Sequence, residues 1–210
     1  MGVQLTQEMV EGAINTQKKY GVPASVTLAQ ILVESGGSYA GGLSGLAYNY
    51  KNLFGIKAGS SWTGESVNLS TGEHFNGQDV TISDAFRVYN SFEDSIEDHG
   101  KLLASDYYTK YTSKATTSDE YAKAIHEAGY ATDPEYSNTL ISLMKQYNLY
   151  QYDSGKIGGI VSTGESSGSS SSGTLGVGSF NLSGLFVLIL VGVFLVFGAM
   201  FMAGAFVGGH

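Results

Sequence analysis

The chain has 210 residues, no cysteine and a formal net charge of −8 at pH 7. Residues 1–153 carry ten of the eleven Lys and Arg side chains and eighteen of the nineteen Asp and Glu side chains, so this part holds the whole net charge. An acidic domain without a basic cluster is repelled by phosphate backbones, which excludes nucleic acid as a partner, and without cysteine neither disulfides nor thiolate metal sites can form.

The first two predicted helices lie within residues 6–34. Over residues 6–20 an apolar stripe at helical spacing alternates with charged faces, which indicates a scaffold helix. Gly21-Val22-Pro23 ends it, and a second, strongly apolar helix follows as far as Glu34, so we expect that helix to be largely buried. Gly36-Gly37 is the predicted stop just beyond its last turn.

Glu34 places one carboxylate at the end of this apolar helix. Partial burial disfavours the ionised form and raises a carboxyl pKa, so a glutamic acid here can stay protonated near neutral pH and donate a proton to a leaving oxygen. The competing interpretation is an exposed helix-end glutamate without a chemical role. The helix alone leaves both interpretations open.

The next segments are predicted as a loop and a β-hairpin. Residues 35–52 are rich in glycine and lack an apolar period, so we expect a loop at the mouth of a site, where Tyr39 and Tyr48 either line a sugar-binding rim or anchor the loop. Residues 66–75 and 78–83 alternate around Asn76-Gly77, a strong hairpin pattern.

Two carboxylates, Glu65 and Glu73, belong to this hairpin lobe.

Three further scaffold helices are predicted over residues 93–105, 118–128 and 136–147, and Tyr130 lies in the polar turn before the last of them, where it could face a cleft. Three of the four histidines, His74, His99 and His126, show no metal-ligand spacing, so we expect surface or core roles for them and neither a metal nor a cofactor.

The remaining residues predict a tether and a membrane span. Residues 154–179 are mostly Gly and Ser, which predicts a flexible linker. The run Leu185 to Val207 has 23 residues without a charge; as a helix it would be about 35 Å long against a hydrocarbon core of about 30 Å, so we predict a transmembrane helix rather than a buried core helix. Its small residues would permit association into a homo-oligomer. The predicted parts are thus 1–153, 154–179 and 180–210.

Six motifs in the first part occur in a recognisable order. They are LAQILVESGG, NLFGIK, the Trp62-Thr63-Gly64 step, STGEHFNG, AFRVYNS and AGYATDPEY. With them the chain resembles the peptidoglycan glucosaminidases of glycoside hydrolase family 73 over roughly residues 5–152. The resemblance implies a lysozyme-like α+β fold, mainly helical with a small β-hairpin lobe, and cleavage of the β-1,4 bond after N-acetylglucosamine in bacterial wall glycan.

The resemblance also implies roles for individual residues. By position, Glu34 matches the proton-donating glutamate, Glu73 the second carboxylate with Glu65 as a nearby competitor, and Tyr130 a tyrosine of the cleft. The predicted substrate-binding residues are Tyr39, Tyr48, Asn52, Phe54 and Trp62. Many members carry Trp-Gly where this chain has Gly37-Ser38, so one aromatic wall of the sugar site is lost here or is supplied by Tyr39 or Tyr48.

The sequence leaves alternatives open for both the reaction mechanism and the function. Glu73 could activate water in an inverting mechanism, or the acetamido group of the substrate could attack while Glu73 or Tyr130 only orients and stabilises it. A lytic transglycosylase on the same fold, or a membrane-active structural protein with a glycan-binding domain, are the competing functions. Because the hydrophobic tail occurs in a chain whose N-terminus lacks a signal-peptide pattern, we expect a membrane-associated hydrolase that faces the wall and is delivered by a phage or conjugation machine.

Overall fold

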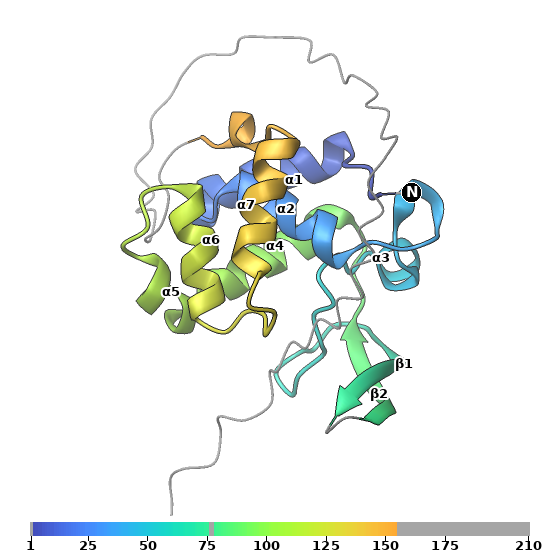
Figure 1. Ribbon diagram of the computed structural model, residues 1–210. Helices are drawn as coiled ribbons and strands as arrows, with labels where there is room; N and C mark the ends of the chain where they lie inside the picture. The colour runs from blue at the N-terminus through green and yellow to red at the C-terminus, as the bar shows by residue number, and fades with distance from the viewer. Residues whose placement is uncertain (1, 76–77, 155–210) are drawn as a thin grey trace, which may run out of the picture.

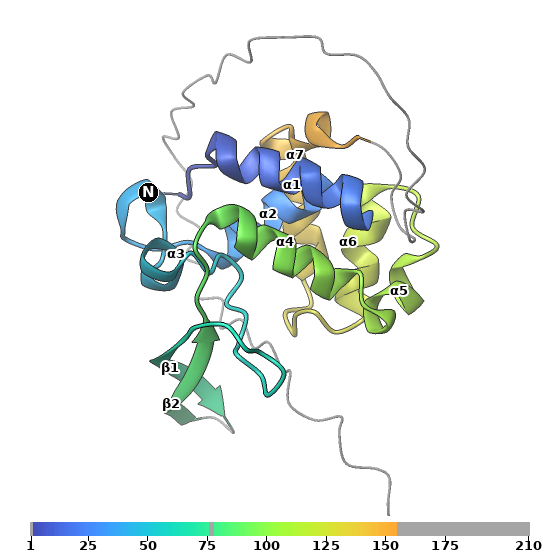
Figure 2. The same cartoon turned by 180° about the vertical axis from the view of Figure 1, so that it is seen from behind.

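The computed structural model describes residues 2–75 and 78–154, with side chains outside residues 71–82 (Figure 1). In chain order the elements are α1 (Gln7–Tyr20), α2 (Ala24–Glu34), the 3-10 helix η1 (Ala40–Gly42), α3 (Gly45–Tyr50), β1 (Ser66–Phe75), β2 (Gln78–Arg87), α4 (Phe92–Leu103), α5 (Asp106–Thr112), α6 (Ser118–Glu127), α7 (Tyr136–Gln146) and the 3-10 helix η2 (Leu149–Tyr152). The helices gather into one body from which the hairpin of β1 and β2 projects (Figures 1 and 2). This is the predicted α+β architecture.

The fold-class prediction also contained a C-terminal transmembrane helix, and this part is corrected. Within residues 2–75 and 78–154, no helix is long and apolar enough to cross a bilayer. The longest of the described helices, α1, has 14 residues, whereas a span needs about 20. The predicted span, Leu185 to Val207, lies outside the described residues.

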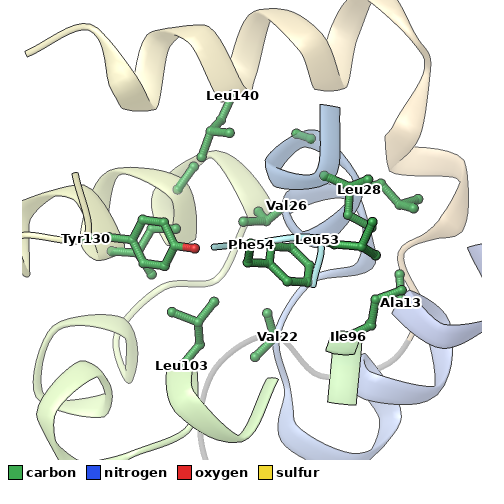
Figure 3. Packing of buried hydrophobic residues seen from close by; sticks show 14 of the residues in the cluster. Ala13, Val22, Val26, Leu28, Leu53, Phe54, Ile96, Leu103, Tyr130 and Leu140 are labelled. Carbon is green, nitrogen blue, oxygen red and sulfur yellow. The ribbon is translucent and has the colours of Figure 1, made fainter. Parts of the chain in front are cut away.

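Helix α2 is the centre of the helical body. Every residue from Ala24 to Ile31 is buried, and α2 contacts α1, α6, α7 and η2. Figure 3 shows Val26 and Leu28 of this helix within the hydrophobic core. A helix that is buried on all its faces belongs in a core rather than on a surface. Its last residue, Glu34, is therefore held by a rigid element.

The start of α2 is capped from the far end of the domain. Pro23 at the N-cap makes no side-chain hydrogen bond. Instead Asp153 Oδ1 accepts the Ser25 N–H at 2.8 Å, while Oδ2 accepts the hydroxyls of Ser25 at 2.7 Å and Ser118 at 2.6 Å. A carboxylate at a helix N-terminus also complements the positive end of the helix dipole. Asp153 thus ties together the first turns of α2 and α6.

Helix α4 packs closely against α1. A Cβ on Gly100 of α4 would collide with the Thr16 side chain of α1, so the absence of a side chain at this position permits the close approach. The neighbouring Asp98 faces the hairpin instead: its Oδ2 accepts Arg87 Nη1 at 2.6 Å and the Tyr89 hydroxyl at 2.7 Å. Helix α4 therefore joins α1 to the base of the β-lobe.

The predicted hairpin is confirmed, with one change of boundary. Strands β1 and β2 pair antiparallel from Ser66 opposite Arg87 to Phe75 opposite Gln78, whereas the sequence placed the end of the second strand at Ser83. The strand continues because Phe86 is buried and bridges to Lys57 outside the hairpin. The Asn76-Gly77 connection itself lies outside the described residues.

Short helices occupy regions where no helix was predicted. The presumed loop over residues 35–52 contains η1 and α3, and α5 follows α4 after a brief turn. Helix α3 has only six residues, too few to show an apolar period, and it depends on a local cap in which Ser44 Oγ accepts the Ala47 N–H at 3.2 Å. Such elements are stabilised by their tertiary surroundings.

Replacing the shared cap should weaken the whole domain. In Asp153→Ala, one backbone N–H and two hydroxyls lose their acceptor at two helix starts, so we expect a loss of about 2–3 kcal/mol in the free energy of unfolding. Urea unfolding of the full chain measures it, and Asp153→Asn, which keeps one acceptor oxygen, should fall in between. If the free energy of unfolding of Asp153→Ala changed by less than about 0.5 kcal/mol, the stabilising role of this shared cap would be contradicted.

Candidate active site

Glu34 is the last residue of α2 and is half-buried. The helix ends at Ser35, whose hydroxyl donates to the Ile31 carbonyl at 2.6 Å. Gly36 then bridges to Leu43, and a Cβ on Gly37 would lie 2.5 Å from Ser44 Cα. The helix therefore ends at a serine cap and not at the predicted glycines. Gly37 instead allows its backbone to pass close to that of Leu43 and Ser44. This approach leaves no room for a side chain at residue 37.

Two features of the surroundings of Glu34 shift its pKa in opposite directions. Burial disfavours the carboxylate and raises the pKa of Glu34 from 4.5 to about 7, although a hydrogen bond from Tyr136 works against this rise. The Tyr136 hydroxyl donates to Glu34 Oε1 at 3.0 Å. Among the described residues this is the one hydrogen bond to the Glu34 side chain, so Oε2 is left to carry the acidic proton.

The hydroxyl of Tyr136 is itself held in place by α2. Gln30, one helical turn before Glu34, donates its Nε2 hydrogen to Tyr136 Oη at 3.1 Å. The tyrosine oxygen therefore accepts from Gln30, and its own proton is directed to Glu34. Neither Gln30 nor Tyr136 was predicted as a site residue. The i, i+4 spacing places Gln30 and Glu34 on one face of the helix, and together with the final tyrosine of AGYATDPEY it is the pattern from which this contact could have been predicted.

Tyr130 lies behind Tyr136 rather than in an open cleft. Its exposure is only 1%, and its ring stacks on that of Tyr136 with centroids 5.6 Å apart and an interplanar angle of 25°. Its hydroxyl is 3.2 Å from His99 Nε2. Burial, followed by the nearby Glu34 charge, raises the pKa of Tyr130 well above its ordinary value, so it stays protonated.

Tyr39 and Tyr48 form an exposed aromatic pair just beyond the end of α2. Their exposures are 48% and 42%, and their rings stack with centroids 5.3 Å apart and planes at 25°. Lys51 Nζ lies 5.7 Å from the Tyr48 ring centroid. Two accessible, preordered rings provide the flat apolar surface on which a sugar ring can stack.

Two of the predicted substrate-binding residues lie in the core instead. Asn52 is buried, and its side chain donates to the carbonyls of Ile56 and Arg87, both at 2.9 Å, while its oxygen accepts the Ile56 N–H at 3.0 Å. Phe54 is also buried and stacks on His99 with centroids 3.9 Å apart. The surfaces of both side chains are thus used in contacts inside the domain.

Trp62 buttresses the base of the hairpin. Its Nε1–H donates to the Glu65 carbonyl at 2.9 Å, and the Arg87 guanidinium lies 4.5 Å from the ring centroid. A Cβ on Gly64 would lie 2.5 Å from the indole ring, so this glycine lets the backbone fold over the tryptophan. The Trp62-Thr63-Gly64 step is therefore a structural corner, and the indole is half-buried, so part of it remains accessible.

The two candidate carboxylates of the hairpin have different positions along it. Glu65 precedes β1 and is exposed. Glu73 lies within β1 opposite Val80, in the half of the strand that is nearer the turn, and its side chain is outside the described part of the structure. The choice between them stays a prediction.

Within residues 2–75 and 78–154, no group of three or more His, Asp or Glu side chains could hold a metal ion. The pocket lined by Thr116, Thr117, Ser118, Asp119, Lys145 and Tyr150 lies at the start of α6. This is the end of α2 that Asp153 caps, opposite to Glu34.

A mainly helical domain built around one buried helix that ends in a glutamic acid with a raised pKa, together with a projecting β-hairpin lobe, has the features of a lysozyme-like glycosidase. The family model described as "Mannosyl-glycoprotein endo-beta-N-acetylglucosaminidase" matches residues 10–149, about two thirds of the chain. The chain therefore belongs to the glucosaminidase family of glycoside hydrolases, as the motifs predicted.

Named relatives and solved structures agree with this assignment. Peptidoglycan hydrolase FlgJ from Salmonella typhimurium is 36% identical over 126 residues, 60% of this chain and 40% of the relative. Exo-glucosaminidase LytG from Bacillus subtilis is 35% identical over 143 residues, 65% of this chain and 48% of the relative. The chain thus spans less than half the length of these relatives. The catalytic domain of the autolysin Auto from Listeria monocytogenes matches with a TM-score of 0.60 at 30% identity, over 72% of this chain and 90% of that chain.

The raised pKa of Glu34 should cost stability at alkaline pH. The folded domain holds this proton up to about pH 7, whereas the unfolded chain loses it near pH 4.5, so wild type should lose stability as the pH rises between these values. Glu34→Gln cannot ionise, and we expect it to be more stable than wild type at pH 8 by about 1–3 kcal/mol, with a much smaller difference at pH 4.

Urea unfolding of both proteins at pH 4 and pH 8 measures this difference. Glu65→Gln, which neutralises an exposed carboxylate on the hairpin, is the matched control. If Glu34→Gln and wild type showed the same dependence on pH, the buried environment of Glu34 would be disproved.

Proposed function

We propose that this domain is a peptidoglycan hydrolase that cleaves the β-1,4 bond after N-acetylglucosamine, with Glu34 as its general acid. The observation that carries the proposal is the half-buried Glu34, which has a pKa of about 7 and, among the residues that the structure describes, a hydrogen bond on one carboxyl oxygen only. Membership of the glucosaminidase family and relatives named peptidoglycan hydrolase, exo-glucosaminidase and autolysin supply the substrate class.

In this proposal, Glu34 Oε2 protonates the glycosidic oxygen as the bond to the leaving sugar breaks. The carboxylate that results has to be stabilised in a partly buried place, where water cannot fully solvate it. The Tyr136 hydroxyl, held by Gln30, already points at Oε1 and therefore gains strength as the charge develops. Burial keeps the proton available, and Tyr136 makes it easier to release.

The second half of the reaction needs a group opposite Glu34. We propose Glu73 for it, because β1 carries this residue toward the free end of the hairpin and it matches the T-x-E step of the family. Either it activates water directly, or the acetamido group of the substrate attacks and Glu73 stabilises the intermediate. We also propose that the exposed Tyr39–Tyr48 pair stacks against a sugar ring and that Trp62 contributes its accessible edge.

We place the end of the catalytic domain at Asp153, because this residue completes the caps of α2 and α6. The site of action that this function implies is the cell wall. Delivery by a phage or conjugation machine was inferred from the C-terminal hydrophobic run, which lies outside the described residues, together with the N-terminal sequence, and it stays a prediction.

Removal of the acidic proton should abolish cleavage. For Glu34→Gln we expect kcat on purified peptidoglycan to fall by about 10²- to 10⁴-fold with an intact fold, and wild-type activity should decline as the pH rises above about 7. Mass spectrometry of the released fragments identifies the new ends. Reducing N-acetylglucosamine ends support the proposal, whereas 1,6-anhydro muramic ends would assign the domain to the lytic transglycosylases.

The two hairpin carboxylates can be separated by isosteric replacement. We expect Glu73→Gln to lower kcat by about 10²-fold or more and Glu65→Gln to stay within about threefold of wild type. Circular dichroism confirms that both variants fold. The opposite ranking would transfer the role to Glu65, and full activity in both variants would remove the hairpin carboxylates from the mechanism.

A further inference from the structure

His99 is a completely buried histidine on α4 that the proposed reaction does not use directly. Its ring stacks on Phe54 with centroids 3.9 Å apart and planes at 10°. Its Nε2 lies 3.2 Å from the Tyr130 hydroxyl, which points toward Phe54 in Figure 3. Its other nitrogen, Nδ1, has no hydrogen-bond partner among the described residues.

This arrangement makes His99 less favourable for the stability of the core than an apolar residue would be. A buried polar atom without a partner costs about 1–3 kcal/mol, and a phenylalanine could occupy the same slot on Phe54 without that cost. Burial lowers the pKa of His99 to about 3, so the imidazole is neutral where the enzyme would work. Either neutral tautomer keeps the bond to Tyr130, since Nε2 can donate to the hydroxyl oxygen or accept its proton.

Buried polar atoms without partners gather around the acid. Within the part of the chain that the structure describes there are three such side-chain atoms: Gln17 Nε2, Gln30 Oε1 and His99 Nδ1. Two of them belong to the residues that hold the hydroxyls of Tyr136 and Tyr130. The core therefore accepts its unfavourable polar atoms mainly where they orient the two tyrosines behind Glu34.

We propose that His99 is a positioning residue for Glu34. By holding the Tyr130 hydroxyl, it fixes the Tyr130 ring in its stack on Tyr136, 5.6 Å between centroids, and this stack keeps the Tyr136 hydroxyl on Glu34 Oε1. His99 itself has no exposed surface with which to contact a glycan. The inference rests on the proposed function, because it assigns a role in setting the acidity of Glu34.

The titratable groups that face this cluster are Glu34, the tyrosines and His126, whose ring centroid lies 5.9 Å from that of Tyr136. Burial raises the pKa of Tyr108, Tyr130 and Tyr136 above the ordinary tyrosine value, so all three keep their protons. Glu34 is the group that accepts the Tyr136 hydroxyl, and its pKa is about 7. A change in the alkaline limb of the pH–kcat profile that persists in a His126→Gln background therefore reports on Glu34.

The test is His99→Phe in the full chain, which keeps the ring on Phe54 and deletes the bond to Tyr130. We expect kcat on peptidoglycan to fall about 10- to 100-fold while KM stays within about threefold. Since the Tyr136 bond favours the carboxylate, a displaced Tyr136 should move the alkaline limb about half a pH unit or more upward. Ile96→Val, a conservative core change on the same helix, should alter neither kcat nor the limb.

A double-mutant cycle with Tyr130→Phe completes the test. If His99 acts through the Tyr130 hydroxyl, the double variant should lose no more than the worse single variant, and Tyr130→Phe alone should show the same shift of the limb. This second variant also decides the matter if His99→Phe does not fold. An unshifted limb in the folded variants, or additive losses in the cycle, would overturn the positioning role. A wild-type protein that releases no glycan fragments would instead overturn the proposed function.

Discussion

The hydrogen bond from Tyr136 to Glu34 joins the end of the central helix to the start of α7, and much of the domain serves to maintain it. An acid in this position needs two conditions that oppose one another. Enough burial must keep its proton, and enough polar support must let the proton leave. Burial of Glu34 meets the first condition, and one tyrosine hydroxyl that is oriented by Gln30 and supported by a stacked aromatic ring meets the second without placing a second charge beside the acid.

Helix α4 shows how closely structural and functional demands can be placed. Asp98 binds the base of the hairpin, His99 reaches the aromatic cluster behind Glu34, and Gly100 allows α1 to approach. Successive residues of a helix point about 100° apart, so three neighbours can serve three different surroundings. The hairpin lobe and the acid thus share one rigid support.

Features that depend on neighbouring residues could be predicted from the sequence, whereas contacts between residues far apart in the chain could not. Helix α2, its terminal glutamate and the hairpin were predictable, because apolar periodicity and an Asn-Gly turn are local patterns. The contact between Tyr136 and Glu34 joins residues 102 positions apart and depends on how α7 docks. Asn52 and Phe54 belong to a motif that marks the family, but burial is a tertiary property, and the motif could not show that these side chains face inward. Helix α3 was missed because it is too short to display a period.

The clamp made by Asp153 determines where the chain leaves the domain. Ser154 departs beside the first turn of α2, and since this helix has 11 residues its far end, with Glu34, is about 16 Å away. Anything joined there is therefore attached at the end of the central helix that lies opposite to Glu34. A pull on that attachment would reach the fold first through Asp153, whose carboxylate holds the first turns of α2 and α6 by three hydrogen bonds.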